Sequence, residues 1–161
     1  MKTIQDPAQP LTQEEGREII GDILIYHMPF NRLLGIDLIR FEHNYAELQF
    51  FNQDKLMGNP VHKILHGGAI ASVLDVAGVL ICANSILAQM ETITGNEIQK
   101  RLPTISTIDL RVDYLRPGRG EVFTVSSNFI RSGKKISVAR IECHNEKQVH
   151  IASATGTYLV G

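Results

Sequence analysis

NPVHKILHGGAIASVLDVAGVLICANSILAQM, residues 59–90, is the stretch of sequence that decides the fold. It opens with a polar turn, passes through His66-Gly67-Gly68 and continues as a run of Ala, Val, Leu and Ile that contains one carboxylate, Asp75. A helix with this composition is apolar on nearly every side, so we expect it to lie in the core of the domain. Asp75 is the exception, because burial of a carboxylate without partners costs free energy.

Asp75 lies on the side of this helix that carries the small residues. At about 100° per residue, the residues on its side are Gly68, Ala71, Ser72, Gly78 and Cys82. The opposite side carries Ile70, Val73, Ala77, Leu80 and Ile81. This pattern predicts a space beside Asp75 for a group that is not one of the protein's own side chains.

The His66-Gly67-Gly68 sequence stands where the helix should begin. Helix N-termini have unpaired N–H groups and a partial positive charge, and glycine lets another molecule approach the backbone closely. An oxygen that gains negative charge during a reaction could be stabilised here, as in an oxyanion hole. The alternative is that both glycines only permit a tight turn into the helix.

This combination resembles the hotdog-fold acyl-CoA thioesterases, and in particular their phenylacetyl-CoA thioesterase-like (PaaI-type) branch. The resemblance rests on HGG followed by an acid nine positions after the His, and on the later segments VDYLRPGRGE, RSGKKISVARIEC and ASATGTYLV. It extends from about Pro29 to Tyr158. It implies an α+β hotdog fold, in which a curved antiparallel sheet wraps around one long helix, and hydrolysis of an acyl-CoA thioester without a cofactor.

The resemblance also implies roles for the residues around this helix. Asp75 would act as a general base on water or attack the thioester directly as a nucleophile, and the residues leave both options open. The backbone N–H of Gly67 would stabilise the oxyanion, while His66 shapes the site. Asn59 would orient the water or the substrate carbonyl, or is simply a turn residue before Pro60. The family's site Asn lies six residues before the His, where this chain has Pro60, so Asn59 would need one extra loop residue.

Substrate-binding residues are expected on three other segments besides Gly68 and Ser72. The apolar connector 28–35 would place Phe30 and Leu33 near the acyl groove by resemblance, or simply pack the end of a helix. Basic residues gather at two predicted turns and suit the phosphates of coenzyme A, although each could equally be a solvated hairpin residue. These residues are Arg116, Arg119, Arg131, Lys134 and Lys135.

Composition favours one soluble domain. The 161 residues are 43% hydrophobic and 20% charged with a formal net charge of −1, which indicates no nucleic-acid or membrane partner. Cys82 and Cys143 lie in apolar segments and are typical of reduced core thiols in a cytoplasmic protein. We expect a flexible N-terminal tail over residues 1–11 and a single domain over residues 12–161.

The remaining elements are predicted from periodicity and turn residues. They are a helix over 13–26 behind the capping box of Thr12, a connector over 28–35, a hairpin of strands 36–42 and 45–51, a polar segment over 91–102, and strands over 104–116, 121–130, 134–143 and 148–160. Residues 144–146 are assigned to a turn, and short turns between the last four strands favour a meander. One sheet on one helix leaves apolar surface, so we expect a homodimer or homotetramer with the groove between protomers, as in the family.

Other chemistries fit less well. A hotdog protein that binds an acyl ligand without turnover would use the same residues, and a hotdog dehydratase would carry a different site motif. His62 and His66 are four residues apart, yet no Glu follows the first His as in a zincin helix, so we expect no metal. The sequence has no G-x-S-x-G, which disfavours an α/β serine hydrolase.

Overall fold

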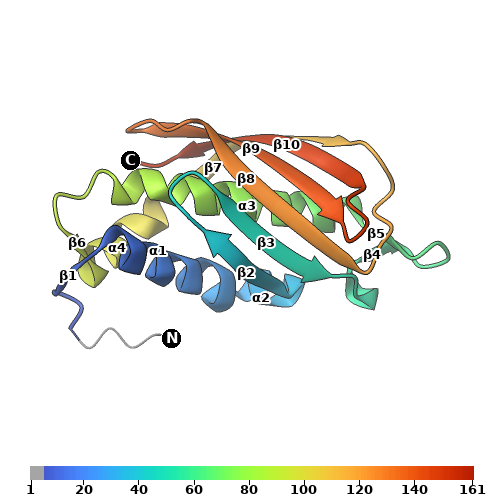
Figure 1. Cartoon of the computed structure of the whole chain (residues 1–161), viewed down its shortest axis with the longest axis horizontal. Helices are drawn as coiled ribbons and strands as arrows, with labels where there is room; N and C mark the ends of the chain where they lie inside the picture. The colour runs from blue at the N-terminus through green and yellow to red at the C-terminus, as the bar shows by residue number, and fades with distance from the viewer. Residues whose placement is uncertain (1–5) are drawn as a thin grey trace.

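The computed structural model describes residues 6–161 of the chain. A curved six-stranded antiparallel sheet wraps around one long helix, and shorter helices lie along the other side of that helix (Figure 1). The predicted α+β hotdog fold with an additional N-terminal helix is therefore confirmed.

The elements fall into three groups. The helices are α1 (Gln13–Gly21), the π-helical segment η1 (Asp22–His27), α2 (Pro29–Leu34), α3 (Gly67–Leu87) and α4 (Gly95–Arg101), with short 3-10 turns η2 (Asp54–Leu56) and η3 (Leu102–Thr104). The main sheet contains β2 (Ile36–Phe41), β3 (Ala46–Phe51), β7 (Ser106–Tyr114), β8 (Val122–Arg131), β9 (Ile136–Asn145) and β10 (His150–Leu159). Two small pairs join β1 (Pro10–Leu11) to β6 (Ile93–Thr94) and β4 (Met57–Asn59) to β5 (Ile64–Leu65).

The central helix α3 starts where the sequence predicts. His66 is its N-cap, and the helix runs through the core between the sheet and the outer helices. It is long and apolar enough to cross a membrane, but 72% of its most apolar window is buried inside the fold. Its composition therefore reflects a core helix covered on most sides.

Three helical segments differ from the prediction. The predicted helix over 13–26 begins at the expected capping box of Thr12 but continues as a π-helical segment after Gly21. The predicted connector 28–35 contains helix α2, because Pro29 fits the first helical turn and Gly35, at φ 69°, ends the helix in the left-handed conformation. The polar segment 91–102 contains α4, whose N-cap Thr94 accepts a hydrogen bond from the Glu97 N–H.

The strand order also differs from a simple meander. The order is β2-β3-β8-β9-β10-β7, so β7 pairs with β10 at the edge and not with β8, its successor in the chain. The connection after β7 crosses the end of the sheet, where the N–H groups of Leu115 and Arg116 both donate to the carbonyl of Ile151. This crossing lets β8 pair with β3 and close the sheet around α3. Strand β9 continues through His144 and Asn145, which the prediction assigns to a turn.

The two basic turns lie at opposite ends of the sheet. Arg116 and Arg119 precede β8, whereas Arg131 ends it and Lys134 lies in the turn to β9. Ten residues of extended chain separate the two turns, which is roughly 30 Å. The two groups of basic residues therefore do not form one cluster within a chain, and the assignment of Lys134 to substrate binding stays a prediction.

The predicted N-terminal tail is described only in part. Residues 1–5 lie outside the described residues. Further along, Pro10 and Leu11 form β1 and pair with β6, which precedes α4. The division into a flexible tail and a single domain stays a prediction.

Candidate active site

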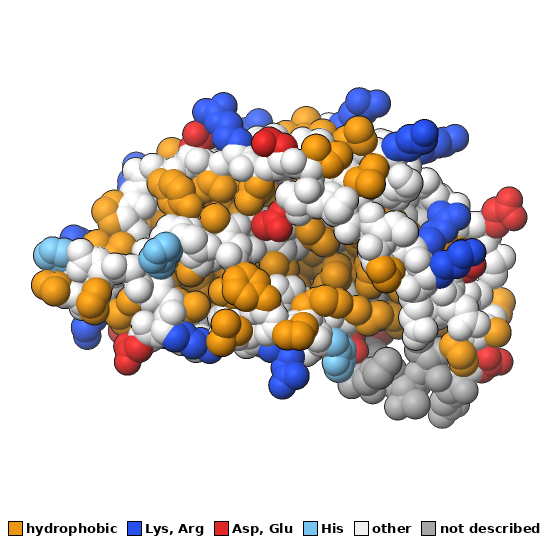
Figure 2. Space-filling view, turned by 180° about the vertical axis from the view of Figure 1, so that it is seen from behind, with side chains coloured by type: hydrophobic (Ala, Val, Ile, Leu, Met, Phe, Trp, Pro, Cys, Tyr) orange, Lys and Arg blue, Asp and Glu red, His pale blue; other side chains and the backbone are white. Residues whose placement is uncertain are grey.

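The N-terminal half of α3 keeps one face uncovered by the rest of the chain. Gly67, Gly68, Ser72 and Asp75 are exposed or half-buried, whereas every residue from Leu80 to Leu87 is buried. Seen from behind the sheet, hydrophobic side chains gather over a wide surface that is hollowed between them (Figure 2). A carboxylate and a helix start therefore share an open, largely apolar face.

Asp75 is held by contacts from two strands. The Thr107 hydroxyl, from β7, donates to the Asp75 carboxylate, with distances of 3.0 Å to Oδ1 and 3.3 Å to Oδ2. The Tyr158 hydroxyl, from β10, donates to the backbone carbonyl of Asp75 at 3.4 Å. No cation pairs with this carboxylate among the described residues. Within residues 6–161, the carboxylate therefore has a hydroxyl donor, Thr107, in place of a cation.

Burial raises the pKa of Asp75 above its ordinary value. The hydrogen bonds from Thr107 and Tyr158 favour the charged form and oppose that rise only in part. A carboxylate with a raised pKa is a better proton acceptor than an exposed one, and such groups concentrate at catalytic sites. The environment of Asp75 thus suits a general base.

A β-bulge brings Thr107 to Asp75. The pairing of β7 with β10 shifts register between Thr157 and Tyr158, and Ile108 is the extra residue. Strict alternation would place Thr107 on the same face as Asp109, but the bulge turns it to the face that meets α3. Sequence periodicity therefore misses this residue, because no single-residue signal marks the bulge.

The predicted space beside Asp75 is partly filled by the protein itself. A Cβ atom on Gly78 would lie 2.0 Å from the Tyr158 hydroxyl oxygen, so Gly78 makes room for this tyrosine. Cys82, also predicted to border the space, is fully buried. Farther toward the helix start, Ser72 and Gly68 line a pocket.

At the helix start, His66 holds the first turn. Its Nδ1 accepts the Gly68 N–H at 2.8 Å, which agrees with a structural role for the imidazole and leaves Gly68 without a free donor. The Gly67 carbonyl accepts from the Tyr114 hydroxyl at 2.7 Å. Within the described residues, the Gly67 N–H has no hydrogen-bond acceptor, and it is therefore available to a ligand.

Gly67 and Asp75 are well separated within one chain. They stand eight residues apart on the same helix, or about 12 Å along its axis. A base and an oxyanion donor must each lie about 3 Å from the reacting atoms. One carbonyl group therefore does not reach both groups in a single copy.

Two apolar pockets flank this face. One, of about 240 Å³, is lined by Phe30, Leu33, Leu34, Lys55, Leu56, His66, Gly68, Ala69 and Ser72. It brings Phe30 and Leu33 together with the helix start, as the family resemblance implies, while the Ser72 hydroxyl donates to the Gly68 carbonyl at 2.7 Å. The other, of about 410 Å³, is lined by Ile23, Leu24, Met28, Val79, Gln99, Leu102, Pro103 and Ile105.

The remaining predicted site residues are spread over the same end of the molecule, except Lys134. Arg116 lines a pocket of about 340 Å³ together with Gly67, and its guanidinium donates to the His150 carbonyl at 3.0 Å. Arg119 lines a neighbouring surface hollow. Asn59 is exposed, and its Oδ1 accepts the His62 N–H at 3.1 Å, so its side chain stabilises the loop before α3.

Comparisons with known proteins agree with this geometry. Residues 62–152 match the model of the thioesterase superfamily. The medium/long-chain acyl-CoA thioesterase YigI of Escherichia coli is 55% identical over 151 residues, which are 94% of this chain and 97% of that protein. A solved structure from Shewanella oneidensis, related to the thioesterase superfamily, has 44% identity and a TM-score of 0.87, covering 95% of this chain and all of that one. The structure of the E. coli PaaI protein, at 19% identity and a TM-score of 0.74, covers 93% of this chain and 96% of its own and shows the same fold.

Proposed function

The chain belongs to the thioesterase superfamily, and we propose that it is an acyl-CoA thioesterase that hydrolyses a thioester to a free acid and coenzyme A. The observation that carries the proposal is the half-buried carboxylate of Asp75, which has a raised pKa and lies on the open apolar face of α3. The activity named for the E. coli relative supports the same reaction.

Asp75 has two possible roles in this reaction. As a general base it takes a proton from water, whose oxygen attacks the thioester carbon; the C–S bond then breaks and the coenzyme A thiolate leaves. As a nucleophile it forms a mixed anhydride with the acyl group, which water then hydrolyses. The raised pKa of Asp75, which has no cationic partner among the described residues, favours the general base, because a stronger proton acceptor is the more effective base.

The oxyanion that forms on the carbonyl is proposed to bind the Gly67 N–H. This donor stands in the first turn of a 21-residue helix and has no acceptor in the described chain. The partial positive charge of the helix N-terminus adds to its effect. The hydrogen bond from Tyr114 to the Gly67 carbonyl fixes the peptide on its other side.

Two protomers complete one site in this proposal. Since Gly67 and Asp75 of one chain are too far apart for one carbonyl, Gly67 of one protomer would act with Asp75 of its partner. Strand β7 offers the interface, because it is a nine-residue edge strand that is mostly exposed. Such an edge has unpaired backbone groups that can pair with a second strand.

The contacts of β7 suggest how the two copies align. Thr107 of β7 contacts Asp75, and Tyr114 of the same strand contacts Gly67. Antiparallel pairing of two β7 strands, centred between Leu110 and Arg111, places Thr107 of one protomer opposite Tyr114 of the other. The same pairing brings each Asp75 toward the partner's Gly67.

Substrate parts are assigned to the neighbouring pockets. The larger apolar pocket suits the acyl chain, since Val79 follows Asp75 by one helical turn and Ile105 precedes Thr107 by two residues. The name of the E. coli relative supports a medium or long acyl group. Arg116, which shares a pocket with Gly67, suits a phosphate of coenzyme A. The buried free thiols of Cys82 and Cys143 support a reducing compartment, the cytoplasm.

Thiol release from a panel of acyl-CoAs tests the function. We expect turnover with medium and long acyl chains, and a loss of about 10²-fold or more in the Asp75→Asn variant, typical of losing a general base. Near-normal turnover in that variant would exclude Asp75 from the chemistry. Saturable acyl-CoA binding with no thiol released by the wild type would show a binding protein instead.

A further inference from the structure

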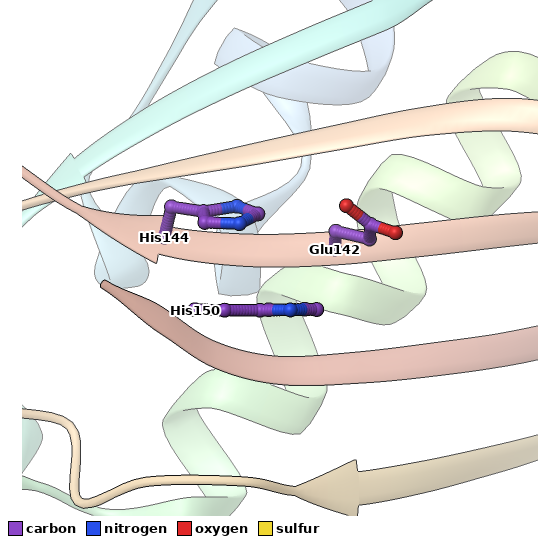
Figure 3. A group of neighbouring side chains, drawn as sticks. All are labelled: Glu142, His144 and His150. Atoms are coloured by element: carbon purple, nitrogen blue, oxygen red, sulfur yellow. The ribbon is translucent and has the colours of Figure 1, made fainter. Parts of the chain in front are cut away.

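Two histidines and a glutamate meet on the face of the sheet that points away from α3. Glu142 and His144 project from β9, and His150 projects from the start of β10 (Figure 3). The residues between them on β9, such as Cys143, are buried toward α3, so the group lies on the opposite side of the sheet from Asp75. Each of the three side chains is half-buried.

A β-bulge positions His150 in this group. The register of β10 against β9 shifts between His150 and Ala152, so that Ile151 is the extra residue. Ile151 and Ala152 are consecutive and both are buried, which breaks the alternation of the strand. Without the bulge His150 would point toward the core; with it, the imidazole lies directly across from His144.

The spacing of the three groups suits a metal ion. Their ligand atoms lie within 4.8 Å of one another, and the two imidazole rings stack with centroids 4.4 Å apart. Ligand atoms about 2.0–2.1 Å from a tetrahedral Zn²⁺ lie about 3.4 Å apart. Small rotations of the half-buried side chains would bring the ligand atoms from their present separations to the separation that a Zn²⁺ ion requires.

The surroundings also favour ligation. The Ser153 hydroxyl lies 2.9 Å from Nε2 of His150 and orients that ring, as second-shell groups do at metal sites. On the neighbouring strand β7, Asp113 stands opposite Ser153, and its carboxylate pairs with Arg111 at 3.0 Å.

We propose that Glu142, His144 and His150 form a binding site for a divalent transition metal such as Zn²⁺, which joins β9 to β10. Two imidazoles and one carboxylate are a ligand set that suits Zn²⁺ and related ions. The ion stabilises the β9–β10 hairpin, and it takes no part in the reaction, because the whole thickness of the sheet separates it from Asp75. In the sequence, this site is marked by Glu142-x-His144 on one strand and by His150 at the start of the next strand.

Metal titration of the untagged full chain tests this site. After chelator treatment, calorimetry with Zn²⁺ should show one equivalent bound per chain, and Co²⁺ should give the visible absorption of a coordinated ion. The His150→Ala and Glu142→Gln variants should each bind at least about 100-fold more weakly, and Ser153→Ala about 10-fold more weakly. His43→Ala, which removes an exposed histidine of the β2–β3 turn, is the matched control and should bind as the wild type does.

The outcomes separate clearly. Binding that disappears in His150→Ala and Glu142→Gln but persists in His43→Ala supports the site. Zn²⁺ should then raise the Tm of the wild type and of His43→Ala, and leave the Tm of the two ligand variants unchanged. No binding below about millimolar Zn²⁺ would overturn the proposal, as would equal binding by wild type and His150→Ala. Glu142→Gln keeps the side-chain volume, so it reports on ligation even where His150→Ala perturbs the hairpin.

Discussion

The two halves of α3 have similar apolar sequences but different surroundings. In the N-terminal half, which we call the open half, Ser72 lines a pocket and Asp75 is half-buried on a surface that the rest of the chain leaves partly uncovered. In the C-terminal half, from Leu80 to Leu87, which we call the closed half, every residue is buried. The difference lies in what covers the helix, since α1 packs against its C-terminal end, where a Cβ atom on Gly16 would lie 3.0 Å from the Leu87 side chain.

Polar groups serve different ends in the two halves. In the closed half, the Asn84 side chain donates to the carbonyls of Glu42 and His43, and the Ser85 hydroxyl lies 2.9 and 2.8 Å from those of Ser132 and Ser137. These contacts tie two turns of the sheet to the helix. In the open half, the Asp75 carboxylate accepts a hydrogen bond from the Thr107 hydroxyl. A helix can thus carry its structural and its reactive polar groups on successive turns.

Removing one N–H group from the open half should have the largest effect. Gly67 is the first residue of α3 and His66 is extended at ψ 133°, so proline fits position 67 and deletes only the donor. We expect Gly67→Pro to lower kcat about 10²–10³-fold in thiol-release assays. Gly67→Ala is the control, since its Cβ meets Tyr114 at the same 3.3 Å but keeps the N–H. Equal activity of both variants would exclude the proposed oxyanion donor.

Truncation in the closed half should change stability and not the chemistry. Leu80 is fully buried, so Leu80→Ala should lower the free energy of unfolding by about 3 kcal/mol, as cavity-forming substitutions do. Val76→Ala, in the open half, should cost about 1 kcal/mol. Urea denaturation measures both. A similar cost at the two positions would mean that the open half is covered as fully as the closed half.

The hydroxyl beside Asp75 should set the pH dependence of turnover. The Thr107 hydrogen bond favours the carboxylate, so Thr107→Val should raise the pKa of Asp75 further and move the acidic limb of kcat/KM to higher pH. At acidic pH we expect a loss of up to about 10-fold, and a smaller one at neutral pH. The control is Thr157→Val, on the outer face of β10. If the acidic limb of the kcat/KM profile does not move in Thr107→Val, a group other than Asp75 is responsible for that limb.

The smallest expected effect is on stability: the ionised Asp75 carboxylate should lower the Tm of the folded protein at neutral pH. Its pKa is higher in the folded state than in the unfolded chain, so the native state binds more protons between the two pKa values. Its contribution is therefore most favourable at low pH and declines as pH rises through the folded pKa. The Tm of Asp75→Asn relative to wild type should increase from pH 4 to pH 7.5. If the Tm of Asp75→Asn minus the Tm of the wild type decreases from pH 4 to pH 7.5, the raised pKa of Asp75 is contradicted.

Sequence periodicity predicts most of this fold, since the composition of α3 and the alternation of the β-strands are local patterns. It does not predict that β7 pairs with β10, because that choice depends on how the sheet closes around α3. It also misses Thr107 and places Tyr158 only on a strand. A bulge at Ile108 turns Thr107 toward α3. The fit of Tyr158 against Gly78 depends on two segments that are distant in the sequence.

One measurement tests the central proposal, that one protomer's Gly67 acts with its partner's Asp75. Gly67→Pro and Asp75→Asn chains, each inactive alone, are co-expressed with different affinity tags, and the mixed dimer is isolated by both tags. If the site spans two protomers, one of its two sites is intact, and the mixed dimer should have about half the wild-type activity. If each site lies within a single chain, both sites carry a defect, and the mixed dimer will be as inactive as either parent.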